Sequence, residues 1–137
     1  MAQPSHRRLN ALALVLAATV AGLIWRLAPL HLPWFLFKYG GSVLWAIALY
    51  FFLATLLPKL SPSRLAILAA LVAALLEFSR LWHTHATDAF RLTLAGRILL
   101  GRFFSLKNIA AYWLAIAVVS LLDHLLSSRT RSSALPA

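Results

Sequence analysis

Long runs of apolar residues, separated by short polar breaks, dominate the chain. Four runs are long enough to cross a membrane, because a helix needs about 17–25 residues to span the hydrocarbon core. The runs cover residues 9–25, 40–57, 65–82 and 109–126. The pattern therefore predicts an all-α integral membrane bundle of four transmembrane helices.

Prolines and aromatic residues mark where the predicted helices end. Pro58 and Pro62 enclose the break between the second and third runs, where proline lacks the N–H group that a helix interior needs. This break predicts a short hairpin loop. The aromatic stretch 34–39 precedes the second run, and its rings beside Lys38 suit the boundary between membrane and water.

The stretch 83–108, between the third and fourth runs, is too polar for a spanning helix and too apolar for a simple loop. Residues 90–94 alternate between apolar and polar, which predicts a short extended piece. Irregular backbone at membrane depth must be buried in protein or line a wet cavity. We therefore expect an interfacial or partly re-entrant segment here. The domain organisation predicted is one transmembrane domain over residues 1–126 and a polar basic tail over 127–137.

Composition supports a membrane protein. Of the 137 residues, 62% are hydrophobic and 12% are charged, and the mean hydropathy is +0.84. Soluble domains average about 45–50% apolar and about 25% charged residues. With no cysteine in the chain, zinc sites with thiolate ligands are excluded.

The charge is strongly basic, with 13 Lys and Arg against 3 Asp and Glu. In a soluble protein this balance would suggest nucleic acid, but here the basic residues are scattered between apolar runs, as is typical of residues at lipid headgroups. We expect membrane lipids as partners and no nucleic acid. The basic residues divide almost evenly between the two faces. Once the arginines of the stretch 83–108 are set aside, the rest favour both termini in the cytoplasm, with the protein in the inner (cytoplasmic) membrane.

Glu77 is the most informative polar residue, because it lies inside the third run. An ionised side chain costs about 2.5–3.5 kcal/mol at the bilayer centre and less toward the edge. Arg80 follows on the same helix face and can neutralise it. Two interpretations stay open: a buried acid that relays a proton or holds the arginine-bearing loop for function, and a helix-end ion pair that locks the loop to the bundle.

Arg91, Arg97 and Arg102 form a second group of candidates. Guanidinium groups bind phosphate bidentately, and Gly96 and Gly101 would let a lipid headgroup approach the backbone. The alternative is that these arginines extend to the headgroups and set the depth of the loop.

The sequence gives little support for metal binding, serine hydrolysis or nucleotide binding. His83, His85 and Asp88 have the types and spacing of metal ligands, but a fourth ligand is missing. Ser79 lacks the Gly-x-Ser-x-Gly elbow of serine hydrolases, and the chain has no glycine-rich nucleotide loop. We therefore assign no catalytic residue, metal or cofactor.

Several short motifs occur in a fixed order. They are Lys38-Tyr39-Gly40, Leu44-Trp45-Ala46, Glu77-Phe78-Ser79, Arg91-x-Thr93-x-x-Gly96, Leu100-Gly101-x-x-Phe104 and Ala111-Tyr112. In these motifs the stretch 38–123 resembles the bacterial membrane family called domain of unknown function 2809 (DUF2809). It is more distantly similar to VanZ-type proteins, which also place a Glu at a helix end before an Arg-bearing loop. The resemblance implies a small multi-pass protein and no particular activity.

We expect a small integral membrane protein that is an accessory or interaction subunit or contacts anionic lipid, rather than an enzyme. A partner membrane protein or larger complex is expected besides lipid. The alternative is a VanZ-like protein or enzyme that binds a polyprenyl or phospholipid phosphate with Glu77 and the Arg91/Arg97 loop. The candidate basic and polar pocket comprises Glu77, Arg80, Arg91, Thr93, Gly96, Arg97, Gly101, Arg102, Asn108 and Tyr112.

Overall fold

The computed structural model describes residues 4–101 and 103–132, and these residues form helices and loops without a strand. The helices are α1 (Pro4–Leu27), α2 (Trp34–Leu56), α3 (Pro62–Ser79), α4 (His85–Leu92), α5 (Leu94–Leu99) and α6 (Leu106–Ser132). Four of the described helices, α1, α2, α3 and α6, are long and apolar enough to cross a membrane. The predicted all-α fold with four spans is therefore confirmed.

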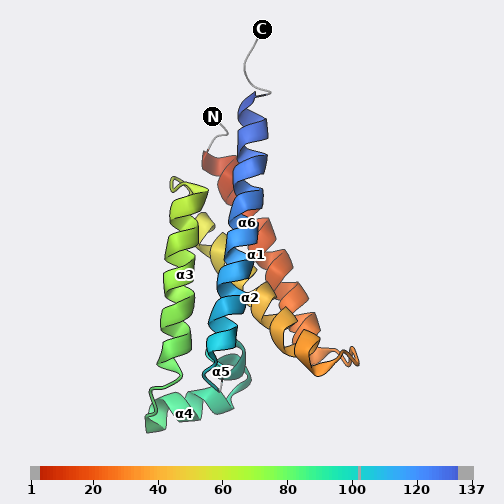
Figure 1. Cartoon of the computed structure of the whole chain (residues 1–137), viewed down its shortest axis with the longest axis vertical. Helices are drawn as coiled ribbons and strands as arrows, with labels where there is room; N and C mark the ends of the chain where they lie inside the picture. Colours follow the sequence, from red (N-terminus) through yellow and green to blue (C-terminus); the bar gives the residue numbers. More distant parts are fainter. Residues whose placement is uncertain (1–3, 102, 133–137) are drawn as a thin grey trace.

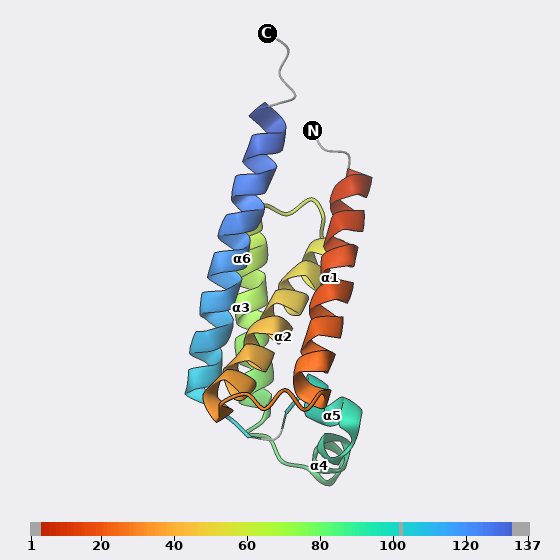
Figure 2. The same ribbon diagram turned by 90° about the vertical axis from the view of Figure 1, so that its right-hand side faces the viewer.

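The long helices run lengthwise, and α1 begins at the same end of the bundle where α6 ends (Figure 1). Helix α2 is central, because α1, α3 and α6 all pack against it. Helices α3 and α6 also pack against each other, whereas α1 packs against α2 alone among the described helices and is joined to α6 at its start by Arg7 and Asp123. Figure 2 shows α1 on one side of α2 and the α3–α6 pair on the other.

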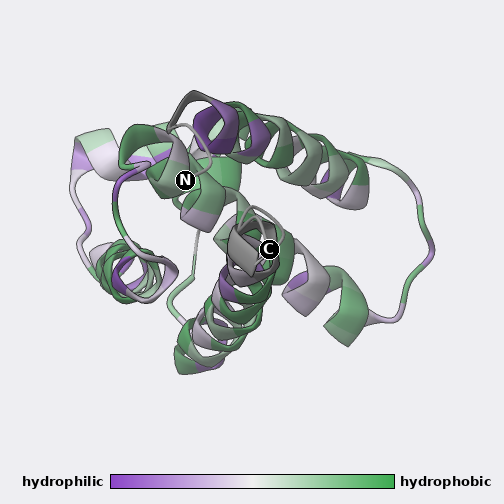
Figure 3. Cartoon of the chain, turned by 90° about the horizontal axis from the view of Figure 1, so that it is seen from above, coloured by the Kyte–Doolittle hydropathy of each residue, from purple (hydrophilic) through white to green (hydrophobic). Residues whose placement is uncertain are grey.

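The core is narrow and contains many alanines. Ala46, Ala69 and Ala73 are completely buried where α2, α3 and α6 meet. Small side chains allow helices to approach closely, which membrane bundles need because lipid provides no hydrophobic drive between helices. The large apolar side chains lie mainly on the outside. Figure 3 shows that hydrophobic residues predominate along the long helices. This distribution is typical of a protein whose surface faces lipid.

The extended piece predicted over residues 90–94 is wrong, because these residues end α4 and begin α5. Thr84 starts α4 through a capping box with Thr87, and Thr93 starts α5 by accepting a hydrogen bond from the N–H of Gly96. Each cap satisfies N–H groups that the first turn of a helix leaves free. The helix caps formed by Thr84 and Thr93 therefore favour helix here, although the short alternating pattern favours an extended strand.

Two helix ends differ from the predicted bounds. Helix α6 continues to Ser132, past the predicted start of the tail at residue 127, and residues 133–137 lie outside the described part of the chain. Helix α2 begins at Trp34, so the aromatic stretch 34–39 forms its first turns. Helix α4 lies across the lower end of the bundle in Figure 1, as expected for an interfacial segment.

Candidate functional site

Glu77 lies in the last turn of α3, and its side chain is completely buried. Its Oε2 atom is 2.7 Å from Nη1 of Arg80 and accepts a hydrogen bond from the Tyr112 hydroxyl at 3.2 Å. Its Oε1 atom accepts hydrogen bonds from the backbone N–H of Ser105 at 2.8 Å and from Nδ2 of Asn108 at 3.2 Å. Both carboxylate oxygens are thus satisfied, and they join the end of α3 to the start of α6.

Arg80 extends this cluster to the segment after α5. Its Nε donates to the carbonyl oxygen of Leu100, and its Nη1 donates to that of Phe103 at 3.2 Å. Gly101 lies directly beneath the guanidinium, where an added Cβ would be 2.8 Å from Cζ of Arg80. Gly101 also has a φ of +69°, a conformation that residues with a Cβ rarely adopt. In this structure Gly101 therefore makes room for Arg80.

Arg91 is buried and faces α3. Its Nη2 donates to the carbonyl oxygen of Ser79 at 2.7 Å, and its Nη1 donates to that of Trp82 at 3.0 Å. Nη1 also lies 3.3 Å from Oδ1 of Asp88. The last carbonyl groups of a helix have no partner within it, so Arg91 caps α3 and ties α4 to it.

Thr93 and Gly96 shape the turn between α4 and α5. The Oγ1 atom of Thr93 accepts a hydrogen bond from the Gly96 N–H at 3.0 Å and donates one to the carbonyl oxygen of Phe90 at 2.6 Å. A Cβ at Gly96 would overlap the carbonyl oxygen of Phe90. Gly96 is thus required by the close approach of the two short helices.

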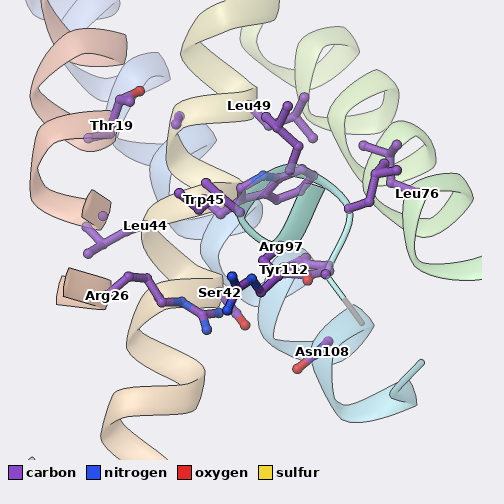
Figure 4. Close-up of a pocket in the computed structure, with 18 of the residues that line it drawn as sticks. Thr19, Arg26, Ser42, Leu44, Trp45, Leu49, Leu76, Arg97, Asn108 and Tyr112 are labelled. Carbon is purple, nitrogen blue, oxygen red and sulfur yellow. The ribbon is translucent and has the colours of Figure 1, made fainter. Parts of the chain in front are cut away.

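A groove of about 760 Å³ lies beside this cluster. Helix α2 forms its floor, α1 and Leu76 of α3 form its walls, and α5 with the loop after it closes one end. Apart from Thr19, the walls away from that end are apolar, with Val15, Leu49 and Phe52 among them. The polar groups gather at the closed end, where Figure 4 shows Arg26, Ser42, Arg97, Tyr112 and Asn108.

Among the cations that line the groove, an acidic side chain neutralises Arg80 alone. The chain has 3 acidic side chains, and each is paired with an arginine: Glu77 with Arg80, Asp88 with Arg91, and Asp123 with Arg7. Arg26, Lys38 and Arg97 line the groove without a carboxylate partner in the described chain. Lys38 instead lies 5.0 Å above the ring of Trp34, and Arg26 lies 5.9 Å above that of Phe37.

The candidate residues thus divide into two sets. Arg80, Arg97, Gly101, Asn108 and Tyr112 line the groove. Glu77, Arg91, Thr93 and Gly96 make the internal contacts described above, and Arg102 lies outside the described residues.

The sequence did not indicate most residues of the groove, including Arg26, Lys38 and Ser42 near its polar end. Arg26 and Lys38 flank the first polar break, and this position could have brought them into the site. The order of residues does not indicate that α1 and α2 enclose a groove.

The potential metal ligands remain too few for a site. His83 Nδ1 is 3.0 Å from Oδ1 of Asp88, and both side chains are largely exposed. Within residues 4–101 and 103–132, no group of three or more His, Cys, Asp and Glu side chains is placed to hold a metal ion.

A second polar cluster lies at the other end of the bundle. The Tyr50 hydroxyl donates to Oδ2 of Asp123 at 2.8 Å, and Arg7 lies 3.4 Å from the same oxygen. Arg7 also donates to the carbonyl oxygens of Pro58 and Leu60, both at 2.8 Å. This cluster joins α1, α2, the loop after α2 and α6, and it is separate from the groove.

A comparison with known protein families identifies the family of this chain. The model of the family described as "Protein of unknown function (DUF2809)" matches residues 31–116. The chain belongs to the DUF2809 family. In this DUF2809 protein the matched part contains the floor of the groove, the Glu77 cluster and the α4–α5 segment, whereas α1 lies before it. No curated protein and no solved structure matches the chain.

Proposed function

We propose that this DUF2809 protein is a multi-pass protein of the bacterial inner membrane that binds an anionic lipid in the groove. The observation that carries the proposal is the groove itself, which combines unpaired basic side chains at one end with apolar walls along the rest. A membrane lipid has the complementary structure, with a charged headgroup at one end and hydrocarbon along the rest.

The length of the groove is close to the depth of one leaflet. Its lining residues run from Val15 to Arg26 on α1 and from Lys38 to Phe52 on α2. At 1.5 Å per residue, these stretches span about 16 Å and about 21 Å, compared with about 15 Å for half of the ~30 Å hydrocarbon core. A headgroup at Arg26 would therefore lie near the membrane surface while its chain lay along α2.

The arrangement of helices supports entry from the bilayer. Among the described helices α1 packs only against α2, so no helix packing closes the groove between α1 and α3. A lipid could move into the groove sideways without leaving the membrane. We place both termini in the cytoplasm, which puts the basic end of the groove at the outer leaflet.

We favour binding over catalysis and over a role that depends on a protein partner. The enzymatic alternative needs Glu77 and Arg91 to face the ligand, but Glu77 is completely buried with both oxygens bonded, and Arg91 is bound to the end of α3. Glu77 therefore acts as a positioning residue that holds the loop closing the groove. The uncompensated charge matches a lipid headgroup directly and requires no additional protein.

The test is the lipid that copurifies with the protein from a membrane of mixed headgroups. We compare wild type with Arg97→Gln and with the control Lys107→Gln, which removes an exposed cation next to the start of α6 that does not line the groove. Anionic lipid should be enriched in wild type and Lys107→Gln and reduced at least about threefold in Arg97→Gln, because charge-assisted hydrogen bonds to phosphate are lost. Equal anionic lipid in the two variants would contradict the proposal.

A further inference from the structure

We infer, on the basis of the proposed function, that the groove selects a lipid whose headgroup ends in a phosphate monoester or diphosphate over one with a phosphodiester. Cationic residues of three separate elements line the groove and carry this selectivity: Arg26 of α1, Lys38 of α2 and Arg97 of α5.

The lining of the groove carries excess positive charge. Every acidic side chain of the protein is already paired with an arginine other than these three cations. Arg80 also reaches the groove, but Glu77 neutralises it at 2.7 Å. A phosphodiester carries one negative charge and would leave two of the three cations uncompensated. A terminal phosphate carries about −1.5 to −2 at pH 7 and compensates most of the excess.

Arg26 reaches the groove beside a glycine of α2. Its guanidinium lies against Gly41, where an added Cβ would be 2.8 Å from Nε. Gly41 is buried, and a larger residue would push Arg26 away from α2. Figure 4 shows Arg26 from α1 and Arg97 from α5 extending toward the region beside Ser42. The glycine thus brings one guanidinium to the same end of the groove as the other.

The arrangement of oxygen atoms on the headgroup also favours a terminal phosphate. A guanidinium binds two oxygens of a phosphate through parallel N–H donors, and an ammonium adds a point charge. A terminal phosphate presents three oxygens that face different directions, which suits donors from three elements. A phosphodiester has only two free oxygens and carries an ester group on the side that α5 occupies when the lipid chain lies along α2.

The test is a titration of the full-length protein in a neutral detergent, followed by tryptophan fluorescence, because Trp45 lines the groove. The probes are dioctanoyl phosphatidic acid, dioctanoyl phosphatidylglycerol, dioctanoyl phosphatidylcholine and glycerol 3-phosphate. Phosphatidic acid should bind about tenfold more tightly than phosphatidylglycerol, a difference of about 1.4 kcal/mol. Phosphatidylcholine and glycerol 3-phosphate, which lack the charge and the chains respectively, should bind most weakly.

Variants connect the preference to the groove. Arg97→Gln and Arg26→Gln, both at exposed positions, should reduce the preference for phosphatidic acid to less than about threefold. The control Lys107→Gln should retain it. An unchanged melting temperature shows that each variant is folded.

The outcomes separate the two proposals. Equal affinity for phosphatidic acid and phosphatidylglycerol, both weakened by Arg97→Gln, would overturn the phosphate-monoester inference and leave lipid binding in place. Equal affinities for anionic and neutral lipid, or identical behaviour of Arg97→Gln and Lys107→Gln, would overturn lipid binding in the groove as well. Glycerol 3-phosphate that binds as tightly as phosphatidic acid would make the ligand a soluble phosphate ester and overturn the lipid.

Discussion

At the scale of single residues, the most informative side chain is the buried carboxylate of Glu77. A buried charge is tolerated only when it is paired and hydrogen-bonded. The sequence predicted Arg80 as its partner, because residues three apart share a helix face. Ser105, Asn108 and Tyr112 come from a distant part of the chain, and no pattern in the sequence connects them with Glu77.

Replacing Glu77 with glutamine should destabilise the protein strongly. The change removes the counter-charge of Arg80. The Arg80 side chain is only 12% exposed, so water cannot fully replace the lost carboxylate. Removing one partner of a buried pair costs about 3–5 kcal/mol. We expect a clearly lower melting temperature in detergent and lower abundance in the membrane for Glu77→Gln.

Asp88→Asn is the matched control for Glu77→Gln. Asp88 also pairs with an arginine three residues on, but the Asp88 carboxylate is 49% exposed and solvated. Its buried partner Arg91 keeps hydrogen bonds to the carbonyl oxygens of Ser79 and Trp82, so we expect a smaller loss of stability than for Glu77→Gln. A Glu77→Gln protein that melts at the same temperature as Asp88→Asn would contradict the structural role of the carboxylate.

Gly101→Ala should destabilise the loop that closes the groove. Its positive φ costs an alanine about 1–2 kcal/mol, and the new Cβ would also displace the guanidinium of Arg80. Gly22→Ala is the control, because its Cβ would lie 3.8 Å from Cβ of Leu44, an ordinary contact. Thermal unfolding of both variants tests this, and equal stability of the two would refute the role of Gly101.

At the scale of elements, the α4–α5 segment is attached to the bundle mainly by side chains. These two helices pack on each other, but neither has helix–helix contacts with the described long helices. Arg91 and Arg80 instead bind backbone carbonyl groups across the junction. The segment therefore depends on a few charge-assisted hydrogen bonds, each worth about 1.5–3 kcal/mol.

Arg91→Gln should loosen this segment selectively. Amide hydrogen exchange in α4 and α5 should become at least about tenfold faster, which corresponds to about 1.4 kcal/mol of local stability. Exchange in α1 and α2 should not change. Lys107→Gln, which removes an exposed cation of α6 outside the groove, is the control and should leave all rates as in wild type. Uniformly faster exchange in every helix would show that Arg91 supports the whole fold instead.

At the scale of the whole molecule, two polar clusters fasten opposite ends of an apolar bundle. The Glu77 cluster joins α3 to α6 at one end, and the Asp123 cluster joins α1, α2 and α6 at the other. Between them the helices meet through small residues. The polar clusters lie near the helix ends, where a charged group costs less than at the bilayer centre.

Cysteine labelling can test this topology, because the natural chain contains no cysteine. Lys59→Cys and His85→Cys place single exposed thiols at opposite ends of α3. With the termini in the cytoplasm, a membrane-impermeant reagent should label His85→Cys in intact cells and Lys59→Cys only after permeabilisation. The reverse result would invert the orientation, and labelling of both from one side would contradict four spans.

Periodicity and composition were sufficient for the number and approximate bounds of the spanning helices, because crossing lipid demands a long apolar helix whatever the neighbouring helices do. The same reasoning located the Glu77–Arg80 pair, since both residues lie on one helix. It failed at residues 90–94, where caps formed by individual threonines override a five-residue pattern.

Only the packing of the helices determined which polar residues line the groove and which are hydrogen-bonded within the fold. Arg91 and Arg97 are both arginines of one short segment, yet Arg91 is bound to the end of α3 while Arg97 lines the groove. The groove brings residues of α1 and α2 together with residues of α5, far along the chain. Such contacts depend on how helices cross in three dimensions, and local spacing carries no information about that crossing.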